Sequence, residues 1–152
     1  MTEPDALSTD LLPGWQEWAA LGQSTSAMLF GELTLKTLAL ASRIFWPALT
    51  WQGECLLLTD GNSPKKLDQW RQKLDGDLRE VESICNLRRL ADLVPDDEQH
   101  PIANAGLEHL GELVRSTWQM AVDRFVGSGR YEVFGAWNAA EEDYRLTIRR
   151  LG

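Results

Sequence analysis

The chain has 152 residues, of which 43% are hydrophobic and 25% are charged, and this composition excludes a wholly disordered protein. Its formal net charge of −8 and its pI of about 4.7 argue against a nucleic-acid or anionic-lipid partner. We also expect no membrane span, because the most apolar stretch, residues 27–49, is interrupted by Glu32, Lys36 and Arg43.

The first residues and the cysteines indicate the compartment. Glu3 and Asp5 stand where a secretory signal carries bases, so no such signal is expected. Cys55 and Cys85 lie in apolar surroundings and form no C-x-x-C motif, which is typical of buried, reduced thiols. The sequence therefore predicts a cytoplasmic protein.

Residues 1–23 are expected to form an N-terminal arm with a short amphipathic helix. Pro13 is a favoured first-turn residue of a helix. The apolar side of this helix would consist of Leu11, Leu12, Trp15, Trp18 and Leu21. Because tryptophan is enriched in binding hot spots, Trp15 and Trp18 could anchor a partner protein; they could also cover the domain itself or join two copies.

A long helix is predicted after the arm. Ser24, Thr25 and Ser26 offer N-cap hydroxyls, and the apolar spacing continues to about Phe45. Pro47 disfavours a helical conformation in the residue before it, so the helix should end near Trp46.

A β-hairpin is predicted next, with strands over residues 48–51 and 54–59. The turn would be Gln52-Gly53, where glycine readily takes a positive φ. Residues 56–58 are consecutively apolar, which predicts a strand covered on both faces and central in its sheet.

Two further helices and a loop follow. Ser63-Pro64 is a strong helix start, and the apolar spacing continues to about Ala91, with Gly76 as the place where the helix would break. A polar loop over 92–101 then leads into a third helix over 102–126.

The last part of the chain alternates between apolar and polar residues, which predicts strands over 131–137 and 144–148. The predicted fold is a single α+β domain over 24–152. It has three main helices, besides the short helix of the arm, packed on one face of a small antiparallel sheet of about four strands. Five tryptophans are expected in the core: Trp46, Trp51, Trp70, Trp118 and Trp137.

Acidic residues are concentrated in two places. The first 35 residues hold five acids and no Lys or Arg, and the second cluster consists of Asp92, Asp96, Asp97 and Glu98. Such surfaces favour a basic partner. We therefore expect a non-enzymatic protein-binding module, such as an immunity or antitoxin-type inhibitor. The expected partner-binding residues are Trp15, Trp18, Asp92, Asp96, Asp97 and Glu98.

Two alternatives remain open. His109 and Glu112 are three residues apart on the third helix and His100 precedes them, so a metal-dependent enzyme could be centred there. No zinc, phosphate-loop or nucleophile motif is present, however, so no cofactor and no catalytic residue is expected. The other alternative is a structural subunit that forms a homodimer through residues 1–22.

Overall fold

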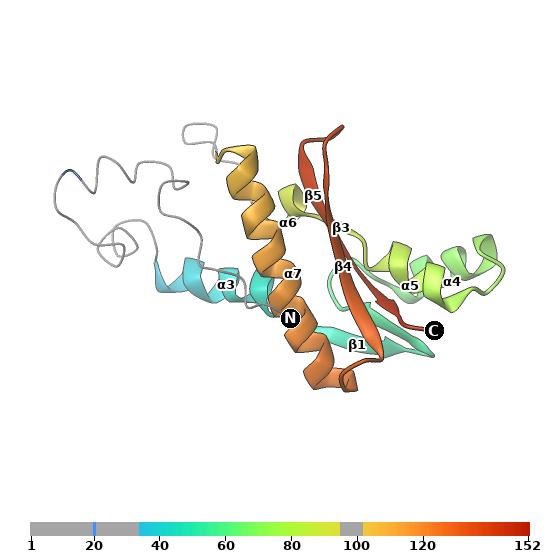
Figure 1. Cartoon of the computed structure of the whole chain (residues 1–152). Coiled ribbons are helices and arrows are strands. Elements are labelled where there is room, and N and C mark those ends of the chain that lie inside the picture. The colour runs from blue at the N-terminus through green and yellow to red at the C-terminus, as the bar shows by residue number, and fades with distance from the viewer. Residues whose placement is uncertain (1–19, 21–33, 95–101) are drawn as a thin grey trace.

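The computed structural model describes residue 20, residues 34–94 and residues 102–152 (Figure 1). The fold is α+β, as predicted. It has two antiparallel sheets, one with the order β1-β2 and one with the order β3-β5-β4, instead of a single sheet. The elements are α3 (Leu35–Phe45), β1 (Leu49–Gln52), β2 (Cys55–Leu58), α4 (Pro64–Lys73), α5 (Leu78–Cys85), β3 (Arg88–Arg89), α6 (Leu90–Leu93), α7 (Asn104–Val126), β4 (Tyr131–Asn138) and β5 (Asp143–Arg150).

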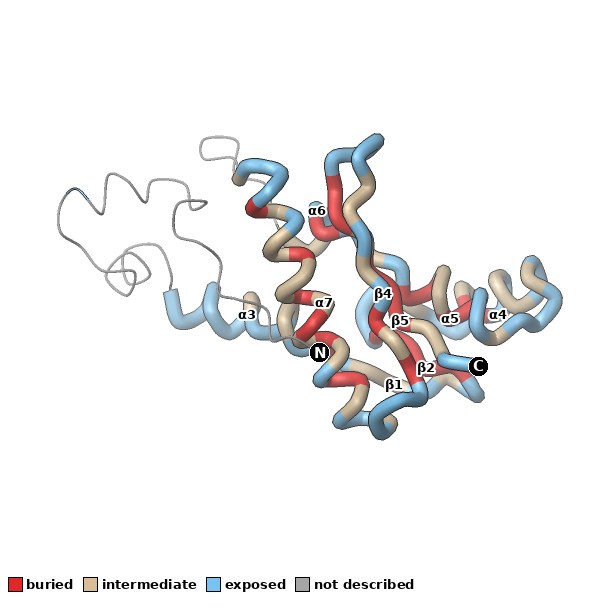
Figure 2. Tube along the Cα trace, viewed as in Figure 1, coloured by how far each residue is buried: buried red, intermediate tan, exposed pale blue. Residues whose placement is uncertain are grey.

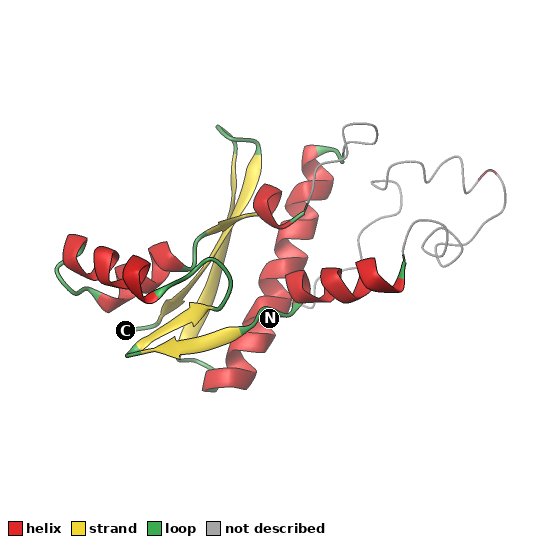
Figure 3. Ribbon diagram, turned by 180° about the vertical axis from the view of Figure 1, so that it is seen from behind, coloured by secondary structure: helices red, strands yellow, loops and turns green. Residues whose placement is uncertain are grey.

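Helices lie on both sides of the three-stranded sheet, which corrects the prediction that they cover one face. Figures 1 and 3 show α7 along one side of the sheet and α4 with α5 on the other. Alternation along β5 explains this arrangement, because Ile148 joins the core cluster with α7 while the neighbouring Thr147 hydroxyl donates to the Ser83 carbonyl of α5. None of the helices within the described residues has the length and hydrophobicity needed for a bilayer span.

Helix α3 begins later than predicted. Thr34 has an extended conformation and its hydroxyl accepts a hydrogen bond from the Thr37 amide, so Thr34 is the N-cap. A continuous helix from Ser24 is therefore wrong. The helix ends at Phe45, as expected before Pro47. The predicted N-terminal arm, 1–23, lies outside the described residues except for Ala20, which is helical and exposed.

The predicted β1–β2 hairpin is confirmed, with its turn shifted by one residue. Gln52 pairs with Cys55, so Gly53 and Glu54 form the turn, and Gly53 has a φ of +61°. All four residues of β2 are buried, as the apolar run predicted. The expected central position of β2 is wrong, because its second edge is covered by side chains of α5 and its C-cap, described below.

The predicted helix over 63–91 is two helices followed by a short strand. It breaks at Gly76, whose φ is +77°, and Asp77 caps α5 by accepting from the amides of Arg79 and Glu80. Helix α5 ends at Cys85, and β3 then pairs with β5. The helix stops early because the Asn86 side chain bonds to the backbone of β2 and β5.

Helix α7 and the β4–β5 hairpin agree with the prediction, and α7 ends at Gly127 with a φ of +88°. They enclose the main core together with β2 (Figure 2). The tryptophans are only partly core residues: Trp118 is buried, Trp70 and Trp137 are half-buried, and Trp46 and Trp51 are exposed. Trp46 and Trp51 correct the prediction: Trp46 is the C-cap of α3, and Trp51 lies on β1, a strand of the small two-stranded sheet.

Candidate functional site

A groove of about 480 Å³ runs along the outer face of the three-stranded sheet, between β4, β5 and α5. The period-two alternation of the two long strands aims one set of side chains at α7 and the other set into this groove. The groove is lined by Ser83, Leu87, Phe134, Ala136, Trp137, Asn138, Ala139, Arg145, Leu146, Thr147 and Arg149. Among the described residues, this lining contains two cations, Arg145 and Arg149, and no carboxylate.

The two arginines of the groove keep hydrogen-bond donors available. Arg149 uses Nε to bind Glu132 Oε1 at 2.6 Å, and its Cζ lies 4.8 Å from the centre of the Phe134 ring. Arg145 binds Glu141 through Nη2, and its buried Nε has no hydrogen-bond partner. A guanidinium has five N–H donors, so both side chains retain donors for a carboxylate or a backbone carbonyl.

Apolar surface accompanies these donors. Phe134 is 47% exposed and Leu87 is 42% exposed, and half-buried Trp137 lines the same groove. Aromatic side chains next to arginine are the residue types that carry most binding energy at protein interfaces. The groove is thus chemically suited to an apolar side chain with a hydrogen-bond acceptor beside it.

Ion pairs connect one end of the groove to Arg89, which directly precedes the short helix α6 that carries Asp92. Arg89 Nε lies 3.0 Å from Asp143 Oδ2 and 3.9 Å from Glu141, the partner of Arg145. The hydrogen bond to Asp143 raises the pKa of Arg89. Asp143 also accepts from the Ala91 amide at 3.2 Å, which fixes the start of α6 beside the β4–β5 turn. Asp92 is exposed on this helix, so the predicted acidic cluster begins at this end of the sheet.

The described part of the chain is electrically balanced. It contains fifteen acids and all fifteen Lys and Arg residues of the sequence, so the eight surplus acids lie in residues 1–33 and 95–101. Many acids of the described part are paired internally, as in Arg150–Glu82, Arg149–Glu132, Arg145–Glu141, Arg115–Glu112 and Arg89–Asp143. The net charge of the protein is therefore confined to the two segments that the sequence singled out.

Most of the predicted partner-binding residues lie outside the described residues: Trp15, Trp18, Asp96, Asp97 and Glu98, as well as His100 of the metal alternative. Asp92 is described and exposed, and it makes no ion pair with another described residue. These residues therefore remain predictions, with Asp92 as the one whose position is known.

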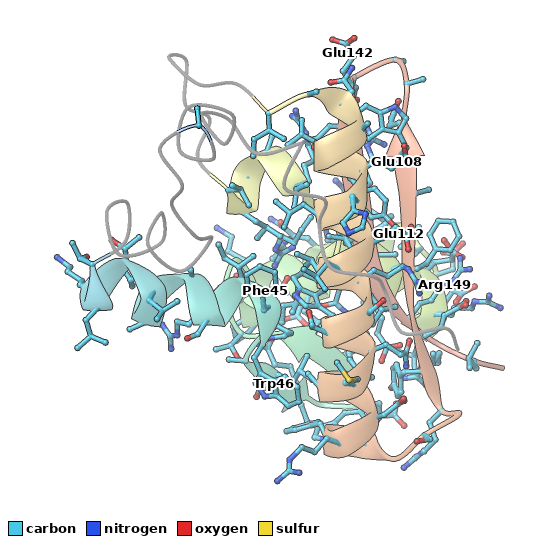
Figure 4. The ribbon with its side chains drawn as sticks, turned by 60° about the vertical axis from the view of Figure 1, so that its left-hand side comes forward. Phe45, Trp46, Glu108, Glu112, Glu142 and Arg149 are labelled. Carbon is cyan, nitrogen blue, oxygen red and sulfur yellow. The ribbon has the colours of Figure 1, made fainter. Side chains whose placement is uncertain are left out.

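The remaining residues of the metal alternative, His109 and Glu112, both lie on α7, and Glu112 faces the sheet (Figure 4). Glu112 accepts hydrogen bonds from the Tyr144 hydroxyl and from Arg115 Nε. Burial raises the pKa of Glu112, but these two hydrogen bonds outweigh it and leave the pKa below its usual value. Within the described residues, no three His, Cys, Asp or Glu side chains are grouped to hold a metal ion.

The cysteines have the predicted state. Cys55 and Cys85 are free and buried, and burial raises the pKa of each thiol, which lowers its reactivity.

Sequence reasoning did not identify the groove. The alternation of the last strand places Arg145, Thr147 and Arg149 on the side away from Leu146 and Ile148, but no function was attached to them. Phe134 was the available signal, because it is an aromatic residue at a polar-side position of an alternating strand.

No protein-family model, curated protein or solved structure matches the chain. Function is therefore argued from the chemistry of the site alone.

Proposed function

We propose that the chain is a non-enzymatic protein-binding module whose partner contacts both the outer-face groove and the acidic segment that begins at Asp92. The observation that supports this most is the charge distribution: a balanced fold next to a segment of unbalanced acids. A surplus of acids over bases gives the chain a negative charge that a basic partner can neutralise.

The two parts of this surface have different roles. Phe134 and Leu87 supply apolar area that water leaves on binding, which stabilises the complex. The acids supply long-range attraction for a basic partner, which raises the association rate and disfavours acidic proteins. Arg89 and Glu141 lie between the groove and α6, which carries Asp92, and this supports a partner that contacts both.

A concrete form of this function is a bacterial immunity or antitoxin-type inhibitor that works in the cytoplasm. In that form Asp96, Asp97 and Glu98 would face the basic groove of a toxin. Trp15 and Trp18 remain predicted contacts of lower priority, because self-association through residues 1–22 would use the same side chains.

The test uses the full chain as bait and compares variants matched in charge and size. One pair is Asp96→Lys/Asp97→Lys/Glu98→Lys against Glu54→Lys/Asp68→Lys/Glu80→Lys, whose acids are exposed elsewhere. The second pair is Phe134→Ala against Phe125→Ala, since both phenylalanines are 47% exposed. A basic protein captured by the wild-type chain is identified, and its binding kinetics with each variant are measured.

We expect the 96–98 variant to slow association about tenfold at low salt, and Phe134→Ala to weaken the affinity about tenfold. The two control variants should behave as the wild-type chain. If each variant and its control bound the partner with the same association rate and affinity, neither the acidic segment nor the groove would be part of the interface. Stoichiometric zinc or manganese in the purified protein would instead favour the metal-dependent enzyme.

A further inference from the structure

Both arginines of the outer-face groove have hydrogen-bond donors that the fold does not use. Arg149 pairs with Glu132 through Nε, and no described residue accepts a hydrogen bond from either of its Nη groups. Arg145 pairs with Glu141 through Nη2, and neither its buried Nε nor its Nη1 has an acceptor among the described residues. Nη groups of both side chains are therefore available to a ligand.

Two acceptors at the groove, in contrast, are already used inside the fold. Asn138 Oδ1 accepts from the Ala140 amide at 3.1 Å, and the Ser83 carbonyl accepts from the Thr147 hydroxyl. No carboxylate belongs to the part of the groove that the described residues line. A ligand that supplies acceptors consequently finds more free partners here than a ligand that supplies donors.

The ion pairs that the two arginines already make leave room for another carboxylate. Glu141 and Glu132 pair with Arg145 and Arg149, but neither acid is among the residues that line the groove. Both pairs are partly exposed, with 39% exposure of each side chain in the Arg145–Glu141 pair, and exposed pairs contribute little to stability. A ligand carboxylate can therefore bind these guanidinium groups without breaking a strong internal contact.

The strand register sets the spacing between the apolar and the cationic parts of the groove. Phe134 lies directly opposite Thr147, so Arg145 and Arg149 are both diagonal neighbours of Phe134 on the same face of the sheet. Diagonal neighbours are about 7–8 Å apart. Side chains two positions apart in an extended peptide lie on one side, about 7 Å from each other. An apolar residue placed on Phe134 thus brings the residue two positions away to one of the arginines.

We propose that the part of the partner that enters the groove is an extended segment in which an apolar residue and a carboxylate residue stand two positions apart. This inference rests on the proposed function, in which a partner protein contacts the groove. The apolar side chain contacts Phe134 and Leu87, which are 47% and 42% exposed, and the carboxylate binds Arg145 or Arg149. A neutral carbonyl makes a weaker bond than a carboxylate to the same guanidinium. The partner is thus basic where it faces the acidic segment and acidic where it enters the groove.

The test titrates short peptides into the isotope-enriched full chain and follows its backbone amide signals. The probe is acetyl-Phe-Ala-Glu-amide, and its matched controls carry Gln or Lys in place of Glu. We expect the Glu peptide to shift the signals of Phe134 and Thr147 saturably. The Gln peptide, which has the same shape without the charge, should bind about fivefold more weakly, and the Lys peptide more weakly still.

Matched protein variants identify the cations. Arg145→Gln/Arg149→Gln should lower the affinity for the Glu peptide to that for the Gln peptide, and should leave the affinity for the Gln peptide unchanged. Arg124→Gln is the control, because Arg124 is exposed on α7 and does not line the groove. Amide signals of α7 report that each variant is folded.

Three results would overturn the proposal. Equal binding of the Glu and Gln peptides would show that the groove does not recognise the carboxylate. Absence of saturable shifts at Phe134 and Thr147 would show that the segment does not bind there. Binding of N-acetylphenylalanine as tight as that of the Glu peptide would identify a small carboxylic acid as the occupant. No partner protein is used and residues 92–98 are unchanged, so failure here is distinguishable from failure of the proposed function.

Discussion

Glu82 and Arg150 form a two-pronged ion pair although 68 residues separate them in the chain. Arg150 Nε lies 2.9 Å from Glu82 Oε2, and Arg150 Nη2 lies 2.8 Å from Glu82 Oε1. The same carboxylate accepts from the Leu56 amide at 2.9 Å and from the Tyr131 hydroxyl at 3.0 Å. Glu82 is fully buried, so this one side chain joins α5, β2, β4 and β5 without contact with water.

Loss of Arg150 should strongly destabilise the fold. We expect Arg150→Met to lower the free energy of unfolding by about 3 kcal/mol or more, because it leaves the buried Glu82 carboxylate without its counter-ion. Arg149→Met is the matched control, since Arg149 pairs with Glu132 at the surface and should contribute about 1 kcal/mol or less. Urea unfolding of the two variants measures the difference. Similar losses of unfolding free energy in the two variants would show that the buried ion pair stabilises the fold no more than the surface pair does.

Tyr131 should make the fold sensitive to alkaline pH. Burial, reinforced by Glu82, raises the pKa of Tyr131 to about 12 from an ordinary value of 10.0. The unfolded chain releases this proton first as pH rises, so the stability that Tyr131 contributes is complete below pH 10 and is lost between pH 10 and 12.

The variant Tyr131→Phe should therefore lose less stability than the wild-type chain over that interval, by about 2 kcal/mol. Denaturant unfolding at several pH values from 9 to 12 measures this, and Tyr144, whose pKa burial also raises, gives both proteins a common residual slope. Parallel stability curves for the two proteins would contradict the assignment.

The sequence predicts local structure well where one residue type decides it. Gly53, the Ser63-Pro64 start and Gly127 were correctly placed, because turns and caps depend on a few neighbouring atoms. The place of β2 in its sheet could not be predicted in this way. Its apolar run indicates two covered faces, but only the tertiary fold determines whether a strand or a side chain satisfies its second edge.

The candidate site shows the same limit. Alternation along β5 indicated which residues face outward, but the groove exists only because α5 packs beside them, through a contact between Thr147 and Ser83. The apolar spacing likewise gave no indication that α5 ends at Cys85. Asn86 neither supports nor breaks the apolar spacing of the helix. Its effect on the helix end depends on hydrogen bonds to backbone groups of two strands that are distant in the sequence.

Asn86 should stabilise β2 in the way that a neighbouring strand would, by bonding to the backbone groups of its second edge. Its Oδ1 accepts from the Leu58 amide at 2.8 Å, and its Nδ2 donates to the Leu56 and Ile148 carbonyls at 2.9 and 3.1 Å. Asn86→Asp removes both donors in a fully buried position, so we expect a loss of about 3 kcal/mol. Thermal or urea unfolding measures it.

Asn62→Asp is the control for this substitution. Asn62 is only half-buried and makes one such bond, from Nδ2 to the Leu58 carbonyl at 2.9 Å. We expect it to cost about 1 kcal/mol. If the two variants were equally stable, side-chain coverage of the β2 edge would have no energetic importance.

Tyr144 fits between α7 and β4 only because glycine stands at two positions. A Cβ at Gly111 would lie 2.2 Å from Tyr144 Cγ, and a Cβ at Gly135 would lie 2.5 Å from the Tyr144 hydroxyl oxygen. Gly111 is in the middle of α7, where alanine is normally favoured over glycine by about 1 kcal/mol. Steric exclusion should reverse that preference, so we expect Gly111→Ala to destabilise the fold by about 3 kcal/mol.

The second variant, Tyr144→Leu, separates this clash from other effects of the substitution. Because the smaller side chain makes room for the new methyl group, Gly111→Ala should cost less in the Tyr144→Leu protein than in the wild-type protein, and the two changes should not add. Glu108→Ala, at an exposed position of the same helix, should change stability little. If Gly111→Ala instead stabilised the protein as helix propensity alone requires, the ring of Tyr144 could not lie against this turn of α7, because no flexible atom is available there to move aside.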